Sequence, residues 1–571
     1  MGRSFECRQE RSTSVNWSLL DHAKGEEDRA LDKPMNRDTS SVPVFARNSS
    51  GLVRAASATD ASFVNMYVAT FPIMLGFMLG LVLAFYPGAN IFVTLGIGFV
   101  LAMPLILTYA MASTVLKRSG GDYVFISRTI HPAIGFAANM VFVLFQTVYL
   151  TSTGYYFCVW GLSPLARFLG VELGNASLVS LSNSLVQPFA IFVVGELFVL
   201  GFAALFIFGS IRGVLKVFRY TMIVSLIGLA ATVVALVLTS PAAVQTAFDS
   251  YVKVATGVTG ASQAVLASAT ANGYTPASFD LGLTILAVSW AAFSLPFYLG
   301  SAYFAGEVRS ARLSQLLAGP ITAIIAFVAA LVLAFLALNA IGQTFLASLV
   351  AASPSATGLG GAPTYMEVAA IATGNPLIGS LIIIGFASWL FPTVPMSLLI
   401  MTRCIFAWSM DRVVPDGLSK VTERSNSPVN AVIVVSLVSV VVAWAWAYTS
   451  IFTVVVGAFG QILALGIGSL GAALIPYKFK GLYDLSPVGW YWGRIPVLSV
   501  VGVAGAIGAL LMVANFARDP NSGVSISASP GMFWFSLALF PIGIAIYFIS
   551  RALRRRQGFD IDLAYAEIPP D

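Results

Sequence analysis

The sequence predicts an all-α polytopic membrane protein. Hydrophobic residues make up 58% of the 571 residues and charged residues only 10%, whereas a soluble globular protein carries about 25% charged residues. The deficit is spread along the chain, because no charged residue occurs between Asp60 and Lys117 or between Arg128 and Arg167. Each gap can hold one or two spans of about 20 residues. Apolar and polar residues do not alternate in short segments, so the pattern does not fit an outer-membrane β-barrel.

Twelve apolar segments are long enough to be membrane spans, and we number them 1 to 12 in chain order. An even number of spans places both termini on the same side of the membrane. The segments fall near residues 62–86, 90–116, 133–160, 188–209, 211–239, 281–305, 318–343, 376–408, 429–449, 451–476, 496–516 and 531–549.

The distribution of lysine and arginine predicts that both termini are cytoplasmic. Of the 31 Lys and Arg residues, the loops on one side hold only Arg167, Lys253 and Arg518, and the other side holds the remaining 28. Cytoplasmic loops of membrane proteins carry the excess of positive charge, which indicates a multi-pass protein of the plasma membrane. Residues 1–58 are polar and lack a signal-peptide core, so we expect a disordered cytoplasmic tail. Residues 551–571 are expected to form a cytoplasmic C-terminal tail.

Composition also argues against several classes of function. Cys7, Cys158 and Cys404 show no CxxC spacing, and the chain has two histidines, so no disulfide framework or metal site is predicted. The net charge of +6 is explained by the cytoplasmic loops and not by nucleic-acid binding. No nucleophile–base set or paired carboxylates occur within the spans, so an enzyme is not expected. The lipid bilayer is the expected environment, and the oligomeric state is left open.

Two proline-containing segments share one pattern at corresponding places in the chain. Thr70–Gly76 reads TFPIMLG in span 1, and Ser294–Gly300 reads SLPFYLG in span 6. Proline interrupts a helix, and interrupted spans in corresponding positions of two halves indicate a transporter binding site between inverted repeats. The repeats would comprise residues 62–239 and 281–476, with spans 11 and 12 at 496–549 as additions. An alternative is that Gly76 and Gly80 simply form a close helix-packing face.

Three loop motifs resemble those of the amino acid–polyamine–organocation permease superfamily. They read RSGGDYVFISRTIHPAIGF (118–136), AGEVRSAR (305–312) and TRCIFAWSMDRVVPDGLSKVTERSNSPVNA (402–431). The resemblance covers about residues 60–550. It implies a leucine-transporter-like fold, with 12 transmembrane helices as a 5+5 inverted repeat plus two, and transport of amino acids or related amines. Coupling would be to Na⁺ or H⁺, or transport would proceed by exchange.

The same loops supply the predicted gate residues. Gly120 and Gly121 permit a tight reversal, and Asp122 is expected to cap a short cytoplasmic helix. Glu307 is expected to form inner-gate ion pairs with the nearby Arg309 and Arg312.

The sequence departs from the family pattern in three ways. Both breaks are at proline instead of glycine clusters, and Tyr298 and Leu299 stand where relatives carry an acidic residue in span 6. This favours a neutral, apolar or aromatic substrate. Some proton-coupled members have a lysine deep in span 5, near the position of Ser225 here.

The predicted substrate site lies at the two breaks and on span 3. Hydroxyls and freed backbone groups would hold the polar head of the substrate, and aromatic rings would wall its apolar part. The residues are Thr70, Phe71, Pro72, Ile73, Met74, Leu75, Gly76, Gln146, Tyr149, Trp290, Phe293, Ser294, Leu295, Pro296 and Phe297.

Two sets of residues are candidates for the coupling ion. Ser388, Thr393 and Ser397 of span 8 offer oxygen ligands beside the carbonyls of span 1, although such hydroxyls often bond their own helix. Glu196 is an ionisable group deep in span 4, where such groups are costly and often functional, but its alternative role is structural. The sequence thus predicts a secondary transporter; a permease-fold sensor that binds without flux is the alternative.

Overall fold

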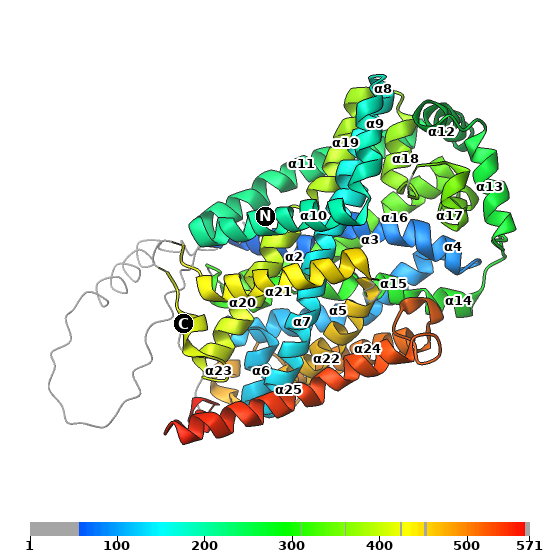
Figure 1. Ribbon diagram of the computed structural model, residues 1–571. Coiled ribbons are helices and arrows are strands. Elements are labelled where there is room, and N and C mark those ends of the chain that lie inside the picture. Colours follow the sequence, from blue (N-terminus) through cyan, green and yellow to red (C-terminus); the bar gives the residue numbers. More distant parts are fainter. Residues whose placement is uncertain are drawn as a thin grey trace, which may run out of the picture. The chain divides into compact units, whose positions relative to one another are not determined.

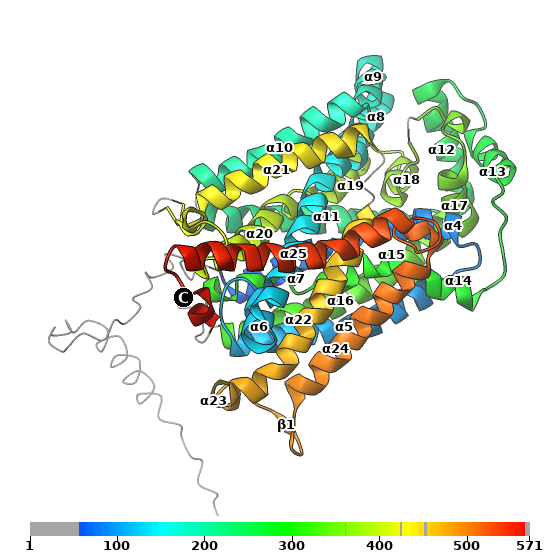
Figure 2. The same ribbon diagram turned by 60° about the horizontal axis from the view of Figure 1, so that its bottom comes forward.

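The computed structural model describes residues 56–209, 211–309, 311–359, 361–422, 425–449 and 454–565. Helices make up most of this part, as predicted (Figure 1, Figure 2). The strands among the described residues are β1 (Tyr491–Trp492) and β2 (Ile495–Pro496), which pair antiparallel. The predicted N-terminal tail falls almost entirely outside the described residues.

Eleven helical segments of the described part are long and apolar enough to cross a membrane. They match predicted spans 1–5 and 7–12 in order. Their elements are α2 (Ala58–Ala69), α3 (Phe71–Phe77), η1 (Met78–Val82) and α4 (Leu83–Phe85) for span 1, then α5 (Ile91–Val115), then α7 (Pro132–Tyr156), η2 (Phe157–Leu162) and α8 (Ser163–Glu172) for span 3, then α10 (Pro188–Phe208), α11 (Ile211–Leu238), α16 (Ala311–Ile341), α19 (Pro376–Ser388) with α20 (Thr393–Met410) for span 8, α21 (Val429–Tyr448), α22 (Val454–Lys478), α24 (Val497–Arg518) and α25 (Pro530–Arg556).

Predicted span 6 is not one regular helix. Within the predicted bounds 281–305, only Leu281–Phe297 forms an apolar helical stretch, and it is shorter than the other spans. The whole segment is built from separate pieces joined by turns. The pieces are the helices α14 (Leu281–Leu286) and α15 (Val288–Ala292), followed by the 3₁₀ turns η3 (Leu295–Phe297), η4 (Gly300–Tyr303) and η5 (Ala305–Glu307).

Shorter helices occupy the connections. The long connection near 240–280 contains two of them. The set is α6 (Asp122–Thr129), α9 (Ala176–Leu185), α12 (Pro241–Thr256), α13 (Ala261–Ala271), α17 (Gln343–Ala351), η6 (Pro354–Ala356), α18 (Tyr365–Ala372), η7 (Asp416–Ser419), α23 (Lys480–Asp484), η8 (Pro520–Ser522) and η9 (Ile561–Tyr565).

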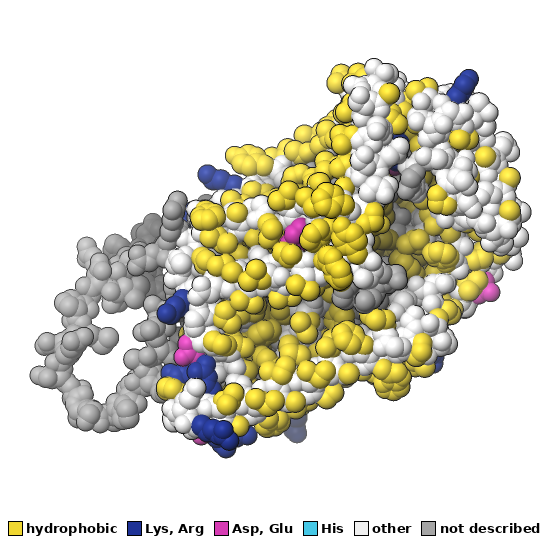
Figure 3. All heavy atoms as spheres, in the orientation of Figure 1, with side chains coloured by type: hydrophobic (Ala, Val, Ile, Leu, Met, Phe, Trp, Pro, Cys, Tyr) yellow, Lys and Arg dark blue, Asp and Glu magenta, His cyan; other side chains and the backbone are white. Residues whose placement is uncertain are grey.

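The spans divide into interior and peripheral ones. The most apolar stretches of spans 1, 3 and 10 are 72%, 83% and 78% buried, whereas those of spans 4, 9 and 12 are 28%, 28% and 17% buried. Apolar side chains accordingly cover the visible face, and most charges lie near its ends (Figure 3). The broken spans therefore lie inside the protein, where irregular backbone in a membrane is tolerated.

The start of span 1 is fixed by polar contacts to distant segments. Ser57 and Asp60 form a capping box on α2, which satisfies the first backbone donors of the helix. Asp60 also accepts two hydrogen bonds from Arg219 of α11, at 2.7 and 2.8 Å. The backbone of Ala56 pairs with Glu307 and Arg309 at the end of η5. The beginnings of spans 1 and 5 therefore meet the end of predicted span 6 on one face, which we call the basic face because the Lys- and Arg-rich loops lie on it.

Candidate binding site

Span 1 is interrupted at Thr70. This residue has φ = +40° and ψ = +54°, a left-handed conformation that costs a non-glycine residue about 1 kcal/mol or more. Pro72 follows in the first turn of α3, where its missing N–H is tolerated. The carbonyls of Val68 and Ala69 are thereby released from regular helical pairing.

Hydroxyl groups from two other spans donate hydrogen bonds to these freed carbonyls. The Ser294 hydroxyl, after α15, donates to the carbonyl of Ala69. The Tyr149 hydroxyl of α7 lies 3.3 Å from the carbonyl of Val68 and 3.2 Å from Thr70 Oγ1. The structure thus brings together Thr70, Tyr149 and Ser294, which the sequence nominated separately.

Aromatic rings pack beside the two breaks. Phe293 lies edge-on to Phe77 at 5.5 Å and to Tyr149 at 6.1 Å between ring centroids. Phe71 points instead to Trp389 of span 8, at 5.3 Å. The Trp290 ring lies 6.2 Å from that of Phe77, tilted against it, and its Nε1 donates to the hydroxyl of Tyr86, at the end of span 1, at 3.0 Å.

Two small cavities flank Tyr149 and Phe293. Each has a volume of about 10 Å³, close to the minimum for one water molecule. The first is lined by Thr70, Ile73, Phe77, Tyr149, Ser152, Thr153, Tyr156, Phe293, Leu390 and Thr393. The second is lined by Val68, Gln146, Tyr149, Phe293, Phe297, Ala458 and Gln461. The breaks are therefore closed around their own polar groups in this conformation.

Gln146 belongs to a buried hydrogen-bond chain across three spans. It donates to Ser397 of α20 at 2.9 Å, and Gln461 of α22 donates to it at 2.7 Å. Sequence reasoning missed Gln461, although a lone amide between apolar residues of span 10 is a usable signal. The chain links spans 3, 8 and 10 beside the second cavity.

A larger cavity of about 290 Å³ lies beyond Phe77. Phe77 lines both this cavity and the first small one, so its ring stands between them. The larger cavity also contains the buried ion pair of Arg167 and Glu367. Two π-helical turns, η1 and η2, contribute to its lining, and such turns often occur at functional sites.

The remaining predicted substrate residues are less central, and all but the half-buried Gly76 are buried. Gly76 lines the larger cavity, facing Trp160. The carbonyl of Pro72 accepts a hydrogen bond from Tyr365 at 3.2 Å. The others pack in the surrounding core and line none of the three cavities: Met74, Leu75, Leu295 and Pro296.

The candidate ion ligands mainly bond the protein itself. Ser388 Oγ lies 2.6 Å from Ser225 Oγ of span 5 and donates to its own helix. Thr393 donates to the carbonyl of Trp389 at 3.0 Å. Glu196 lies in α10 and accepts a bond from Ser439 of α21 at 2.7 Å. These side chains occupy two separate places, and a coupling role for any of them stays a prediction.

The gate residues are placed differently from expectation. Glu307 pairs with Arg403 of α20, at 2.6 and 2.9 Å, instead of with Arg309 beside it. The backbone N–H of Gly120 donates to the carbonyl of Tyr303 at 2.9 Å. Gly121, with φ = +55°, packs against the Tyr303 ring so closely that a Cβ there would overlap it. The loop before α6 is therefore clamped onto the end of predicted span 6.

Asp122 does not cap α6 in the expected way. The N-cap is Gly121, without a side-chain bond, and Asp122 is fully buried. Its Oδ1 accepts from Asn139 of α7 at 2.7 Å and from the Tyr123 N–H at 3.1 Å. Its Oδ2 has no hydrogen-bond partner among the described residues. Burial raises the pKa of this carboxyl to about 7.

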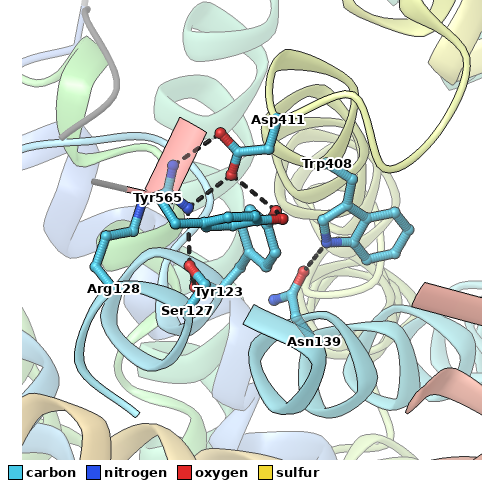
Figure 4. Close-up of polar contacts among 7 residues, drawn as sticks. All are labelled: Tyr123, Ser127, Arg128, Asn139, Trp408, Asp411 and Tyr565. Carbon is cyan, nitrogen blue, oxygen red and sulfur yellow. Dashed lines mark hydrogen bonds and ion pairs between the residues drawn. The ribbon is translucent and has the colours of Figure 1, made fainter. Parts of the chain in front are cut away.

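A second buried ion pair closes the same face (Figure 4). Arg128 of α6 reaches both oxygens of Asp411 at the end of α20, at 2.6 and 2.8 Å. Tyr123 donates to Asp411 at 2.8 Å and lies 3.1 Å from the hydroxyl of Tyr565 in η9. The predicted C-terminal tail thus contributes a side chain to this cluster, which sequence reasoning did not anticipate.

Comparison with known proteins agrees with this architecture. A search of curated proteins gave no match. The family model described as "Amino acid permease" matches residues 62–547, nearly the whole of the helical part. This family lies within the superfamily that the three loop motifs resemble. The chain therefore belongs to the amino acid permease family.

Proposed function

We propose that the protein is a secondary active transporter that moves an amino acid or a related small organic amine across the plasma membrane by alternating access. The observation that carries the proposal is the contact between the two breaks, in which Ser294 donates to the freed carbonyl of Ala69. Carbonyls released at a broken span are suited to an ammonium group. The substrate would take the carbonyls of Val68 and Ala69, and Ser294, Thr70 and Tyr149 would turn their hydroxyls to it.

The closed basic face supports alternating access. Buried pairs Arg403–Glu307 and Arg128–Asp411 close this face, whereas a cavity of about 290 Å³ approaches the breaks from beyond Phe77. We take the basic face as cytoplasmic, following the excess of positive charge. The structure would then represent a state closed to the cytoplasm, with the ring of Phe77 between an external cavity and the substrate site.

The lining of the small cavities favours a neutral substrate. Charged side chains are absent from the two linings given above, and the rings of Phe293 and Phe77 with Ile73 and Leu390 supply apolar walls. A cationic or anionic side chain would lose its hydration there without gaining a partner. We therefore expect neutral amino acids with apolar or aromatic side chains to be the best substrates.

Uptake by proteoliposomes tests the proposal. Purified protein would be offered a panel of labelled amino acids and amines, with pH and sodium gradients imposed separately, in uptake and in exchange mode. We expect saturable flux of at least one neutral amino acid. Specific binding without uptake or exchange would indicate a sensor instead, and neither binding nor flux would refute the proposal.

Ser294→Ala tests the assigned site. The change leaves the Ala69 carbonyl without its donor, at a cost of about 1–3 kcal/mol, so we expect at least a tenfold loss of uptake from a protein that still folds. Ser436→Ala is the matched control, because the Ser436 hydroxyl donates to the carbonyl of Val432 in its own helix, the peripheral α21. Equal uptake by the two variants would show that the substrate binds elsewhere.

A further inference from the structure

The last described residue of the chain, Tyr565, lies against the ion pair that closes the basic face (Figure 4). Its ring centroid is 4.9 Å from the Arg128 guanidinium carbon, within the range of a cation–π contact. Its hydroxyl is 3.1 Å from that of Tyr123, which bonds Asp411. Tyr565 therefore contacts both partners of the ion pair. It contacts Arg128 of α6 directly, and it reaches Asp411 at the end of α20 through the hydroxyl of Tyr123.

The segment that carries Tyr565 is anchored independently of the Arg128–Asp411 ion pair, which we call the gate here. Asp562 forms ion pairs with Arg551 and Arg555 of α25, and Ile561 is buried. Tyr565 also lies 6.3 Å from Tyr547 of α25 between ring centroids. Because α25 packs along α7, the segment η9 bridges a peripheral helix to the gate.

The gate cannot open without disturbing this bridge. Arg128 and Asp411 come from α6 and α20, elements that must separate if water is to reach the breaks from the basic face. The side chains of this pair are at most 1% exposed, so separation would hydrate both charges. The ring of Tyr565 covers the guanidinium and would have to leave it or move with it.

We propose that η9 is a latch that holds the basic face closed through Tyr565. In this proposal the contacts of Tyr565 with Arg128 and Tyr123 stabilise the closed ion pair. Release of η9 removes these contacts and raises the population of the state that is open on the basic face. The inference rests on the proposed function only in taking that open state to be part of a transport cycle. Its test does not require a substrate.

Cys404 is a native reporter of this opening. It is fully buried in α20, one residue after Arg403. In a background with Cys7→Ala and Cys158→Ala, Cys404 is the only thiol of the chain. Its rate of labelling by a water-soluble maleimide in the purified full-length protein then measures the fraction of molecules open to water at this depth.

Tyr565→Ala should raise the labelling rate about tenfold, which corresponds to about 1.4 kcal/mol. Tyr565→Phe keeps the ring but loses the hydroxyl contact, so its rate should lie between those of the parent and Tyr565→Ala. Asp562→Asn releases the anchor without touching the gate and should also raise the rate. Leu563→Ala is the matched control, because Leu563 lies in the same segment and is 68% exposed.

Labelling of Tyr565→Ala and Asp562→Asn at the rate of Leu563→Ala would overturn the latch. If Tyr565→Ala fails to fold, as judged by gel filtration, Tyr565→Phe and Asp562→Asn decide the question. A higher rate in Asp562→Asn with an unchanged melting temperature supports the proposal, because general unfolding would raise the labelling rate and lower the melting temperature together. The proposal would also be contradicted if the control Leu563→Ala raised the labelling rate and lowered the melting temperature as much as Tyr565→Ala does.

Discussion

Asp122 differs from the other buried carboxylates near the basic face because no arginine neutralises it. Asp60, Glu307 and Asp411 each pair with an arginine, whereas Asp122 forms no ion pair with a described residue. The groups that face it from neighbouring elements are neutral: Tyr109 of α5, Asn139 of α7, Tyr303 of η4 and Cys404 of α20. Gly468 of α22 adds no titratable group. Arg128, on the same helix, is committed to Asp411.

This environment predicts a pH dependence of basic-face closure. In the closed state the pKa of Asp122 is about 7, and in water it would be about 3.9. The closed state therefore binds the proton more tightly. Closure is therefore fully favoured below about pH 4, loses up to a factor of ten for each pH unit between about pH 4 and pH 7, and is independent of pH above that.

The labelling rate of Cys404, compared with Asp122→Asn, measures this effect. The asparagine variant cannot ionise, so the ratio of parent to variant rates removes the intrinsic pH dependence of the thiol. We expect a ratio that rises up to about tenfold from pH 5 to pH 6 and levels off above pH 7. Glu196→Gln, a change at a buried carboxylate in α10, should leave the profile unaltered. A ratio independent of pH would show that Asp122 does not titrate on opening.

At the scale of elements, the break in span 1 depends on Pro72. A proline inside a helix costs about 3 kcal/mol relative to alanine, and it removes the N–H that would pair with the carbonyl of Val68, four residues earlier. Thr70 adds the cost of a left-handed residue. The sequence therefore opposes a continuous helix at this point.

Pro72→Ala should let α2 and α3 join. The new N–H at position 72 can take the Val68 carbonyl from Tyr149, and Thr70 can relax to a helical conformation. We expect a higher melting temperature together with at least a tenfold lower uptake. Pro132→Ala is the control, because Pro132 lies in the first turn of α7, where proline and alanine are both accepted. Retained uptake at a raised melting temperature would show that the break is not needed for transport.

The positions of the elements could be predicted from local sequence, and their irregularities only in part. Eleven of the twelve spans predicted from hydropathy match long apolar helices of the described part. This local prediction works because a span needs only about 20 apolar residues, whatever its neighbours are. Proline marks the break in span 1 for the same local reason. The 3₁₀ turns that replace a helix after Ser294 were not predictable, because contacts with other spans stabilise them: the N–H of Gly120 and the side chain of Asn65 each bond this segment.

At the scale of the whole molecule, the gate pairs join residues far apart in the chain. Glu307 and Arg403 are separated by 96 positions and Arg128 and Asp411 by 283. Sequence proximity suggested Arg309 as the partner of Glu307, but Glu307 pairs with Arg403, while the backbone N–H of Arg309 donates to the carbonyl of Ala56. Gln461 and Tyr565 were missed for the same reason, because their roles arise only when distant elements pack. Local patterns therefore predict the scaffold better than the contacts that close it.

Closure of the basic face should therefore depend on complete pairs. Glu307→Gln leaves the Arg403 guanidinium, which is 0% exposed, buried without its carboxylate. Loss of one partner of a buried pair costs about 3–5 kcal/mol, so we expect a clear fall in thermal stability and faster labelling of Cys404.

The double variant Glu307→Gln with Arg403→Met removes both charges and should recover much of the stability, because the cost comes from the uncompensated charge and not from loss of attraction alone. Asp416→Asn is the surface control. Asp416 is 60% exposed in its pair with Arg554, and such pairs contribute about 1 kcal/mol or less. Thermal unfolding of the four proteins in one detergent provides the comparison. If the double variant unfolds at the same temperature as Glu307→Gln, the uncompensated charge of Arg403 is not the source of the cost. The geometry of the hydrogen bonds between Glu307 and Arg403 would then account for the contribution of the pair.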